Sequence, residues 1–329
     1  MTIGYSRARE ILAAAVGRRV IVLGDLMLDR YIWGTVGRIS PEAPVPVVEV
    51  EEESSRLGGA GNVVANLRRL GAEVTPVGVV GDDASGAAVV SLLREQGVET
   101  SGIVVESGRT TSVKSRVIAH SQHVVRVDRE SKSPVRKETA QKVLAFLETV
   151  MDQADVLIFQ DYNKGLLTPP LIACSMELAH SKGVMTAVDP KFENFFAYTG
   201  ATLFKPNRKE TERVLGRLLQ DRAAVAEAGR ELQNRLQCRF LMITLGEDGL
   251  YLLGRDEQAE FIPTRARKVA DVSGAGDTVI STAALALAAG ASITEAAVLA
   301  NYAAGVVCGE VGVVPIEPEA LLHALRDEQ

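Results

Sequence analysis

Short apolar runs alternate along the chain with stretches of helical periodicity. The runs are rich in Val, Ile, Leu and Phe, as is typical of strands buried on both faces. They occupy residues 20–24, 74–80, 156–159, 184–188, 202–204 and 240–245. Helical segments are predicted between them. This alternation favours an α/β fold in which helices cover both faces of a mainly parallel sheet.

Two of the helical segments carry end signals. The first is predicted to begin at Ser133 as N-cap with Pro134 in the first turn, and its apolar residues between 143 and 151 follow the helical period. The second spans residues 83–96 and is followed by Gly97, which suits the left-handed position after a helix.

Two stretches break the alternation. Residues 31–56 contain three prolines and then closely spaced valines, a composition that confines strands to sheet edges. Residues 101–129 alternate polar and apolar positions, as at 112–117. We expect these two stretches to form a small β-sheet lid beside one α/β domain that spans residues 1–329.

Charge and cysteine content narrow the functional class. The 36 basic and 42 acidic residues give a net charge of −6, which is unfavourable for nucleic-acid binding. No apolar run approaches the roughly 20 residues that a membrane span needs. The three cysteines form no CxxC pair, so neither a disulfide framework nor a zinc site is expected. We expect a cytoplasmic protein with no nucleic-acid or membrane partner.

The sharpest chemical motif is Asp-Val-Ser-Gly-Ala-Gly-Asp-Thr at residues 271–278, followed by a helix of small apolar residues at 279–290. Glycines at a helix N-terminus expose N–H groups that bind anions. Asp277 lies beside this anion site, where it could take a proton from a hydroxyl that attacks a phosphoryl group. The alternative is a helix-capping aspartate without a chemical role.

Other polar residues follow strands or open helices. Asn62, after the glycines of 58–61, could bind a hydroxyl-rich ligand, or the glycines could only make a tight turn. Asp29 follows the first strand, where ligands of α/β sheets bind. Asn207 and Glu210 could approach Mg²⁺ or only cap a helix. Neither a Walker motif nor a dinucleotide fingerprint is present.

The elements at 58–62 and 271–277 resemble those of the ribokinase-like (PfkB) sugar kinases, and the resemblance covers nearly the whole chain. It implies a three-layer α/β/α fold with a mainly parallel central sheet and a small β-sheet lid. It also implies ATP and Mg²⁺ as cofactors and leaves open a monovalent cation.

The resemblance also assigns roles to individual residues. The catalytic base and its anion hole would be Asp277, Gly274, Ala275 and Gly276. The groups that hold sugar hydroxyls would be Asp29, Gly58, Gly59 and Asn62. The groups near the nucleotide would be Lys191, Thr244, Gly246 and Asn301, with Asn207 and Glu210 near its phosphates and Mg²⁺, through water.

A narrower resemblance covers residues 24–31, 38–47, 161–165 and 189–191. These segments look like those of kinases that act on D-glycero-D-manno-heptose 7-phosphate. It implies phosphorylation of the C1 hydroxyl to the 1,7-bisphosphate, on the route to the activated heptose of lipopolysaccharide. Because the chain ends at Gln329, we expect a stand-alone kinase, with a separate phosphatase and adenylyltransferase acting downstream.

The phosphate of such a substrate needs cations. Lys114 and Arg116 are two apart in a predicted strand and so point to one side, and Arg38 lies in the other lid segment. We predict that these three bind the phosphate, with Asp161 and Lys164 near the site. The alternative is a strand face with ordinary surface charges.

Three other functions stay open at this stage. They are a kinase for another sugar, such as a ribokinase or fructokinase, a non-catalytic sugar or nucleotide sensor, and a dehydrogenase, which the missing fingerprint disfavours. The apolar edge at residues 45–50 predicts a homodimer through the lids.

Overall fold

The computed structural model describes residues 3–119, 122–255, 259–266 and 269–326. Within them, a nine-stranded sheet forms the centre of the molecule, in the order β13-β12-β11-β10-β9-β8-β1-β4-β5. Pairing is parallel from β5 to β11 and antiparallel at the β11–β12–β13 edge. The strands are β1 (Arg19–Gly24), β4 (Glu73–Gly81), β5 (Ile103–Glu106), β8 (Val156–Gln160), β9 (Met185–Asp189), β10 (Leu203–Phe204), β11 (Phe240–Thr244), β12 (Leu250–Gly254) and β13 (Glu260–Ile262).

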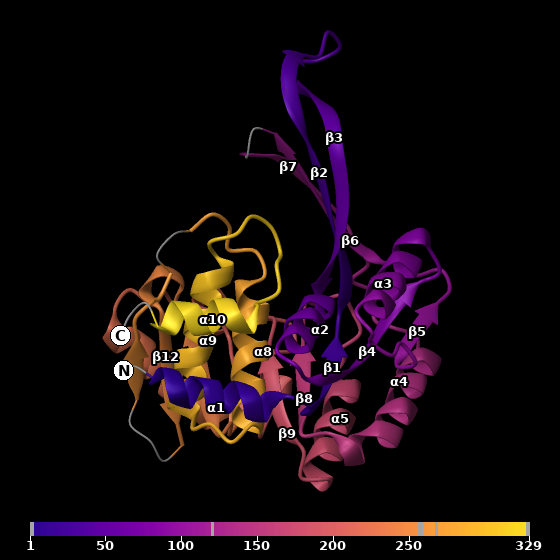
Figure 1. Ribbon diagram of the computed structural model, residues 1–329. Helices are drawn as coiled ribbons and strands as arrows, with labels where there is room; N and C mark the ends of the chain where they lie inside the picture. Colours follow the sequence, from indigo (N-terminus) through magenta and orange to yellow (C-terminus); the bar gives the residue numbers. More distant parts are fainter. Residues whose placement is uncertain (1–2, 120–121, 256–258, 267–268, 327–329) are drawn as a thin grey trace.

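Helices cover both faces of this sheet (Figure 1). One apolar core lies under α1 (Tyr5–Ala15), α2 (Ala60–Arg69), α3 (Ala84–Glu95), α8 (Ala275–Ala288), α9 (Ile293–Val307) and α10 (Pro318–Arg326). The other lies under α4 (Lys137–Val150), α5 (Pro169–Ser181), α6 (Arg208–Leu215) and α7 (Arg222–Leu236). The expected three-layer α/β/α architecture is confirmed, and each predicted strand is found. None of the described helices has the length and apolarity that a membrane crossing requires.

Helix α4 begins later than its sequence predicts. Its N-cap is Arg136 rather than Ser133. The Val135 N–H donates to the Gly165 carbonyl at 2.9 Å, and the Arg136 N–H donates to the Glu106 carboxylate at 3.0 Å. These long-range bonds hold the residues before Lys137 outside the helix, so the prediction of a start at Ser133 was wrong.

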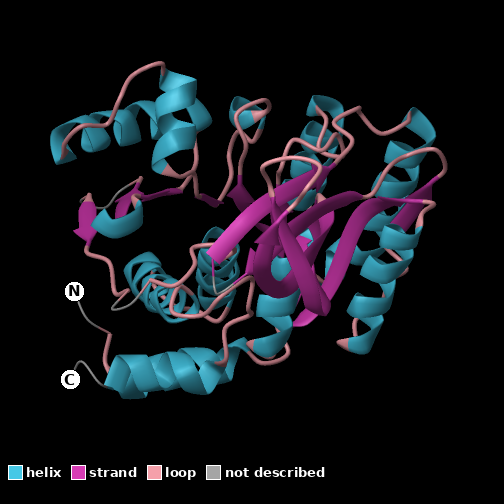
Figure 2. Ribbon diagram, turned by 90° about the horizontal axis from the view of Figure 1, so that it is seen from above, coloured by secondary structure: helices cyan, strands magenta, loops and turns pink. Residues whose placement is uncertain are grey.

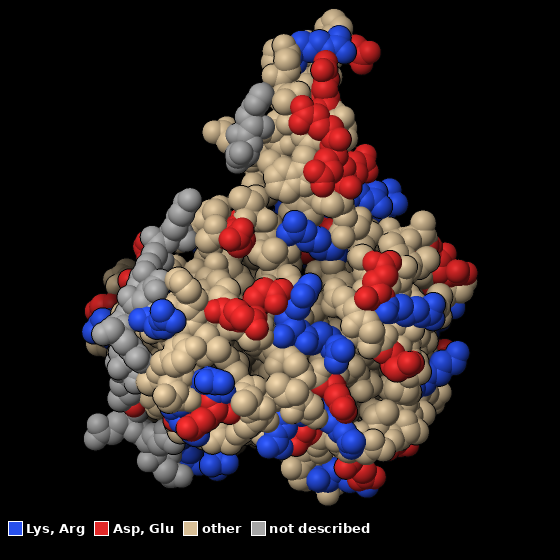
Figure 3. Space-filling view, in the orientation of Figure 1, with Lys and Arg blue, Asp and Glu red and all other residues tan. Residues whose placement is uncertain are grey.

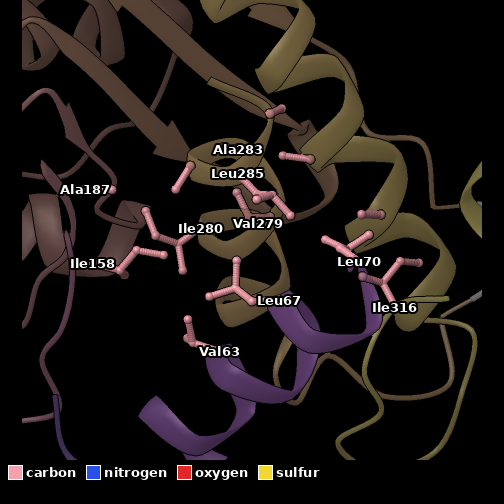
Figure 4. Close-up of a cluster of buried hydrophobic side chains, with 14 of the residues drawn as sticks. Val63, Leu67, Leu70, Ile158, Ala187, Val279, Ile280, Ala283, Leu285 and Ile316 are labelled. Atoms are coloured by element: carbon pink, nitrogen blue, oxygen red, sulfur yellow. The ribbon is translucent and has the colours of Figure 1, made fainter. Parts of the chain in front are cut away.

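The packing of α2 against α8 fixes the start of α8. Val63 and Leu67 of α2 lie against Val279, Ile280 and Ala283 of α8 (Figure 4). These side chains are at most 5% exposed, and full burial of a large one contributes about 1.5–3 kcal/mol. Because α8 continues directly from the glycine motif, this packing sets the position of that motif.

A second sheet, in the order β3-β2-β6-β7, projects from the body as a long arm (Figure 1). Its strands are β2 (Leu26–Ile39), β3 (Pro46–Gly59), β6 (Ser112–Ala119) and β7 (Gln122–Arg129). Seen from above, the arm rises over the middle of the molecule, between the helices (Figure 2). This is the predicted lid, with two differences in its bounds. It begins at Leu26, and β5 belongs to the central sheet because it pairs with β4.

The two faces of the lid differ in chemistry. Asp29, Tyr31, Lys114 and Arg116 share one face, because Asp29 pairs with Lys114 and Tyr31 with Arg116 in the parallel β2–β6 register. The opposite face of β7 presents Val125 and Val127, which are 48% and 57% exposed. Acidic side chains also line the arm (Figure 3), including the exposed Glu49, Glu51, Glu52 and Glu53 of β3.

Candidate active site

The centre of the candidate site is the carboxylate of Asp277, in the first turn of α8. It is 3% exposed and accepts three side-chain hydrogen bonds. The Asn62 amide donates to Oδ2 at 2.8 Å. The Gln160 amide and the Tyr162 hydroxyl donate to Oδ1 at 2.9 and 2.7 Å. The four residues come from α8, α2, β8 and the loop after β8, so the fold itself assembles this cluster.

Burial raises the pKa of Asp277 from 3.8 to about 6, and nearby Asp189 adds to the shift. The hydrogen bonds from Asn62 and Tyr162 and the charge of Lys205 act in the opposite direction. The carboxylate is therefore ionised at neutral pH, yet basic enough to accept a proton from a hydroxyl group.

The glycine-rich start of α8 lies directly beside this carboxylate. Gly274 is the N-cap of α8 with φ +82°, and a Cβ there would lie 2.8 Å from the Asn62 amide nitrogen. At Gly276 an added Cβ would have the Lys205 Nζ and the Asp189 carboxylate as its nearest neighbours, at 3.6 and 3.9 Å. A ligand could therefore approach the backbone at Gly276, with the Lys205 ammonium next to it, whereas the Ala275 N–H already donates to the Val272 carbonyl at 3.3 Å.

Lys205 and Asp189 form a buried ion pair at 3.0 Å. The Gln160 amide joins the pair to the base, because its Nε2 donates to Asp189 at 3.1 Å as well as to Asp277. Asp189 ends β9 and Lys205 follows β10, so the carboxyl ends of adjacent parallel strands supply both charges.

On the lid side, Arg116 donates to the Asp29 carboxylate at 2.7 Å, and both side chains are buried. The other Asp29 oxygen faces Gly58, where an added Cβ would lie 2.4 Å from it. At Gly59, φ is +57° and a Cβ would meet the Asp25 carbonyl at 2.5 Å. The lid base can therefore hold Asp29 against α2 only with glycines at both positions. Because Asp29 neutralises Arg116, this guanidinium is less available to a phosphate than the sequence suggested.

The remaining predicted lid cations differ in availability. The Lys114 ammonium lies 5.0 Å from the centre of the Tyr162 ring and has no ion-pair partner among the described residues. Burial lowers the pKa of Lys114. Lys164 pairs with Glu130 at 2.6 Å. Arg38 is exposed and is the strand partner of Val47 in the outer part of the lid. It lies beyond Gly34, the last β2 residue that pairs with β6. The structure thus brings Lys114 to the site and does not bring Arg38 there within one chain.

Asp161 lies next to the site, but its carboxylate is engaged elsewhere. It accepts hydrogen bonds from the Tyr198 hydroxyl and the Asn163 N–H, each at 2.8 Å. Burial, with a contribution from Asp25, raises the pKa of Asp161 to about 7. The loop after β8 therefore places Asp161 toward Tyr198 and Tyr162 toward Asp277.

Among the residues that the resemblance assigns to the nucleotide, Asn207 and Glu210 form a reciprocal capping box at the start of α6, with both bonds at 2.9 Å. The Lys191 ammonium forms an ion pair with the Glu210 carboxylate, and the backbone of Thr244 forms an isolated parallel β-bridge with that of Asn207. An added Cβ at Gly246 meets no atom within 4 Å. Asn301, on α9, donates to the Pro263 carbonyl at 2.6 Å.

Within the described part of the chain, no group of three His, Cys, Asp or Glu residues is arranged to hold a metal ion. The side chains of Asn207 and Glu210 each already accept a hydrogen bond from the backbone N–H of the other residue. They therefore fit a Mg²⁺ ion that keeps its water ligands and is carried mainly by nucleotide phosphates.

Four residues of the cluster were not among the sequence-based candidates: Gln160, Tyr162, Asp189 and Lys205. A signal for three of them exists, because Gln160, Asp189 and Lys205 are the first polar residues after apolar strand runs. Parallel neighbours bring such positions to one edge of a sheet.

Comparison with known proteins shows the family of this chain. The family profile described as "pfkB family carbohydrate kinase" matches residues 18–320. The proteins named "Bifunctional protein HldE" from Geobacter metallireducens and Paramagnetospirillum magneticum are 42% and 44% identical, over 98% and 95% of this chain. The chain spans 64% of the length of each of these relatives.

Solved structures share the fold at lower identity. Phosphofructokinase-2 from Escherichia coli in complex with potassium has a TM-score of 0.79 at 19% identity, covering 95% of this chain and 99% of that one. Arabidopsis thaliana ribokinase, complexed with ribose and ATP, has a TM-score of 0.74 at 17% identity, covering 94% and 99%.

Proposed function

Because the chain belongs to the pfkB family of carbohydrate kinases, we propose that it transfers the γ-phosphoryl group of ATP to the C1 hydroxyl of D-glycero-D-manno-heptose 7-phosphate. The product would be the 1,7-bisphosphate, a precursor of the activated heptose of lipopolysaccharide. The observation that carries the phosphotransferase chemistry is the ionised Asp277 beside the open N-terminus of α8, with Lys205 next to both.

The choice of sugar rests on two supports. The segments at 24–31, 38–47, 161–165 and 189–191 resemble those of heptose 7-phosphate kinases. In addition, Lys114 lies on the lid face that carries Asp29 and has no ion-pair partner in the described part of the chain. Such a cation suits the distal phosphate of a sugar phosphate.

The residues have separable tasks in this reaction. Asp29 and Asn62 hold sugar hydroxyls, and Asp277 takes the proton of the hydroxyl that attacks the γ-phosphorus. The N–H groups at Gly274, Ala275 and Gly276, with Lys205, stabilise the charge on the transferred group. Lys191, Thr244, Gly246 and Asn301 line the nucleotide side. Mg²⁺ bound with the nucleotide, near Asn207 and Glu210 through water, would neutralise phosphate charge.

The lid also supports a dimer. Val125 and Val127 of β7 and Val50 of β3 are about half exposed on a sheet that projects into solvent. Unpaired apolar strands are normally covered. We propose that the lids of two copies cover each other in a homodimer.

The test is a coupled assay of ADP formation with D-glycero-D-manno-heptose 7-phosphate, ribose, fructose and fructose 6-phosphate, each repeated with Asp277→Asn. We expect turnover with the heptose phosphate alone. Turnover with a different sugar only would reject the heptose assignment and keep the chemistry. ATP binding without turnover on any sugar would favour a non-catalytic sensor.

A further inference from the structure

Three side chains donate hydrogen bonds to Asp277, and one of them differs from the other two in its exposure and in its further hydrogen bonds. Asn62 and Gln160 are each 1% exposed, and each has a second anchor. The Asn62 amide oxygen accepts from Asn66 at 3.2 Å, and Gln160 donates to Asp189. Tyr162 is partly exposed, lies in the loop after β8, and makes its one described side-chain hydrogen bond to Asp277. Tyr162 is therefore the donor with the fewest described side-chain hydrogen bonds that would hold it on Asp277.

The bond from Tyr162 has the chemistry of the bond that a substrate must make. A hydroxyl group donates to Asp277 Oδ1 at 2.7 Å, which is the geometry in which a general base accepts a proton from an attacking hydroxyl. Burial holds the pKa of Tyr162 well above 10, so the phenol keeps its own proton and cannot act as a nucleophile. While it is in place, the same oxygen has no room for a water molecule, because Gln160 occupies its other acceptor direction.

Tyr162 also contacts the lid. The Lys114 ammonium of β6 lies 5.0 Å from the centre of its ring, and the Lys191 ammonium on the nucleotide side lies 5.2 Å from it. Lys114 faces Asp29 in the register of the lid. A sugar phosphate that engages Lys114 and Asp29 changes the contact that holds the ring, and its own hydroxyl can then replace the phenol on Asp277.

We propose that Tyr162 selects the nucleophile: it occupies the proton-accepting oxygen of Asp277 in the enzyme without sugar, and it yields that oxygen to the sugar hydroxyl. This inference rests on the proposed kinase function. The step it suppresses is hydrolysis, in which Asp277 takes a proton from water, the water oxygen bonds to the γ-phosphorus, and the bond to the ADP oxygen breaks, which gives ADP and phosphate.

The experiment compares Tyr162→Phe with Tyr198→Phe. Both variants remove a phenol hydroxyl that donates to a buried carboxylate, but the Tyr198 hydroxyl donates to Asp161 and not to Asp277. Phosphate release from ATP and Mg²⁺ without sugar should rise about tenfold or more in Tyr162→Phe, stay near the wild-type rate in Tyr198→Phe, and return to that rate in Tyr162→Phe/Asp277→Asn. An unchanged or lower rate in Tyr162→Phe, with a normal melting temperature and normal ATP binding, would overturn the proposal.

The pH dependence of activity shows whether the sugar displaces the Tyr162 hydroxyl from Asp277 or whether that hydroxyl stays bound throughout. The Tyr162 bond lowers the pKa of Asp277, so its loss moves the acid limb of activity to higher pH. If the sugar displaces the phenol, Tyr162→Phe shifts that limb for kcat/KM, which reports the free enzyme, and not for kcat, which reports the sugar complex. A shift of both limbs would mean that Tyr162 stays on the base throughout, and the proposal would fail. The hydrolysis assay needs no sugar, so a wrong assignment of the sugar would show separately, as absent transfer beside raised hydrolysis.

Discussion

The Asn62 amide nitrogen and the Asp277 carboxylate lie 2.8 Å apart although 215 residues separate them in the chain. Asn62 stands in the first turn of α2 and Asp277 in the first turn of α8, and the two helices pack side by side. The contact joins the helix that follows the lid to the helix that carries the anion site. The sugar side and the phosphoryl side of the proposed reaction therefore meet at one hydrogen bond.

Replacement of the base should abolish most activity. Asp277→Asn keeps the size of the side chain but cannot accept the proton, so we expect kcat to fall by about 10²–10⁴-fold. ADP formation measures the loss, and thermal unfolding with ATP binding checks that the protein is intact. Near-normal turnover in a folded Asp277→Asn protein would exclude Asp277 as the base.

The acid limb of activity should report Asp277. Its pKa is raised to about 6 by burial, and the reaction needs the ionised form. We therefore expect kcat/KM to be constant above this pH and to fall about tenfold for each pH unit below it. The measurement is kcat/KM from pH 4.5 to 8 with circular dichroism at each pH as a control for unfolding. A limb near pH 4 would contradict the assignment.

Gly58 should tolerate no side chain. In Gly58→Ala the new Cβ would lie 2.4 Å from Asp29 Oδ2 and 2.9 Å from its Cγ, so Asp29 or the lid must move. We expect KM for the sugar to rise about tenfold or more and KM for ATP to change little. The matched control is Gly37→Ala, on the same lid, where an added Cβ meets no atom within 4 Å. Equal kinetics for the two variants would contradict the role of Asp29.

Lys114 should distinguish sugar phosphates from free sugars. Lys114→Met removes an ammonium with no ion-pair partner among the described residues, so we expect little loss of stability. A lost charge-assisted bond should raise KM for a sugar phosphate about tenfold or more. Arg126→Met is the control, because Arg126 is an exposed lid cation that already pairs with Asp128. No effect of Lys114→Met on KM would remove Lys114 from the phosphate site.

A homodimer formed through the lids would have twice the mass of one chain. Light scattering at micromolar concentration should give twice the chain mass of 35.1 kDa. Val127→Glu, on the exposed valine face, should shift the protein toward the monomer. Leu218→Glu, at a site 67% exposed outside the lid, should not. A wild-type monomer under these conditions would contradict the proposal.

The central strands were predictable from sequence because their signal is local. Residues 20–24 and 156–159 are apolar runs that need no knowledge of their neighbours to read as buried strands. The start of α4 was not predictable in this way. The N–H groups of Val135 and Arg136 are taken by Gly165 and Glu106, which lie elsewhere in the sequence, and these bonds override a good capping signal at Ser133.

The same distinction holds in the site. The glycine motif at 271–277 lies within seven residues, so Asp277 could be singled out as a candidate base from sequence. Tyr162 contacts Asp277, which is more than a hundred positions away in the chain, and no local pattern marks that contact. Gln160 carries only the signal of a polar residue at the end of an apolar run, which does not identify Asp277 as its partner. Arg116 was identified as a lid cation, but its pairing with Asp29 depends on the β2–β6 register.

The lid has a mechanical property that follows from its pairing. β2 and β3 are each 14 residues long and pair from Leu26–Gly59 to Ile39–Pro46, with register shifts between Trp33 and Gly34 and between Val36 and Arg38. Together they form one beam of about 45 Å. Asp29 lies three residues from the base of this beam and Arg38 lies twelve, so a tilt at the base displaces Arg38 roughly four times as far as Asp29. Conversely, a contact at the outer end of the lid acts with about a fourfold lever on Asp29, the carboxylate that we propose binds the sugar, so a weak contact at the tip restrains Asp29 strongly.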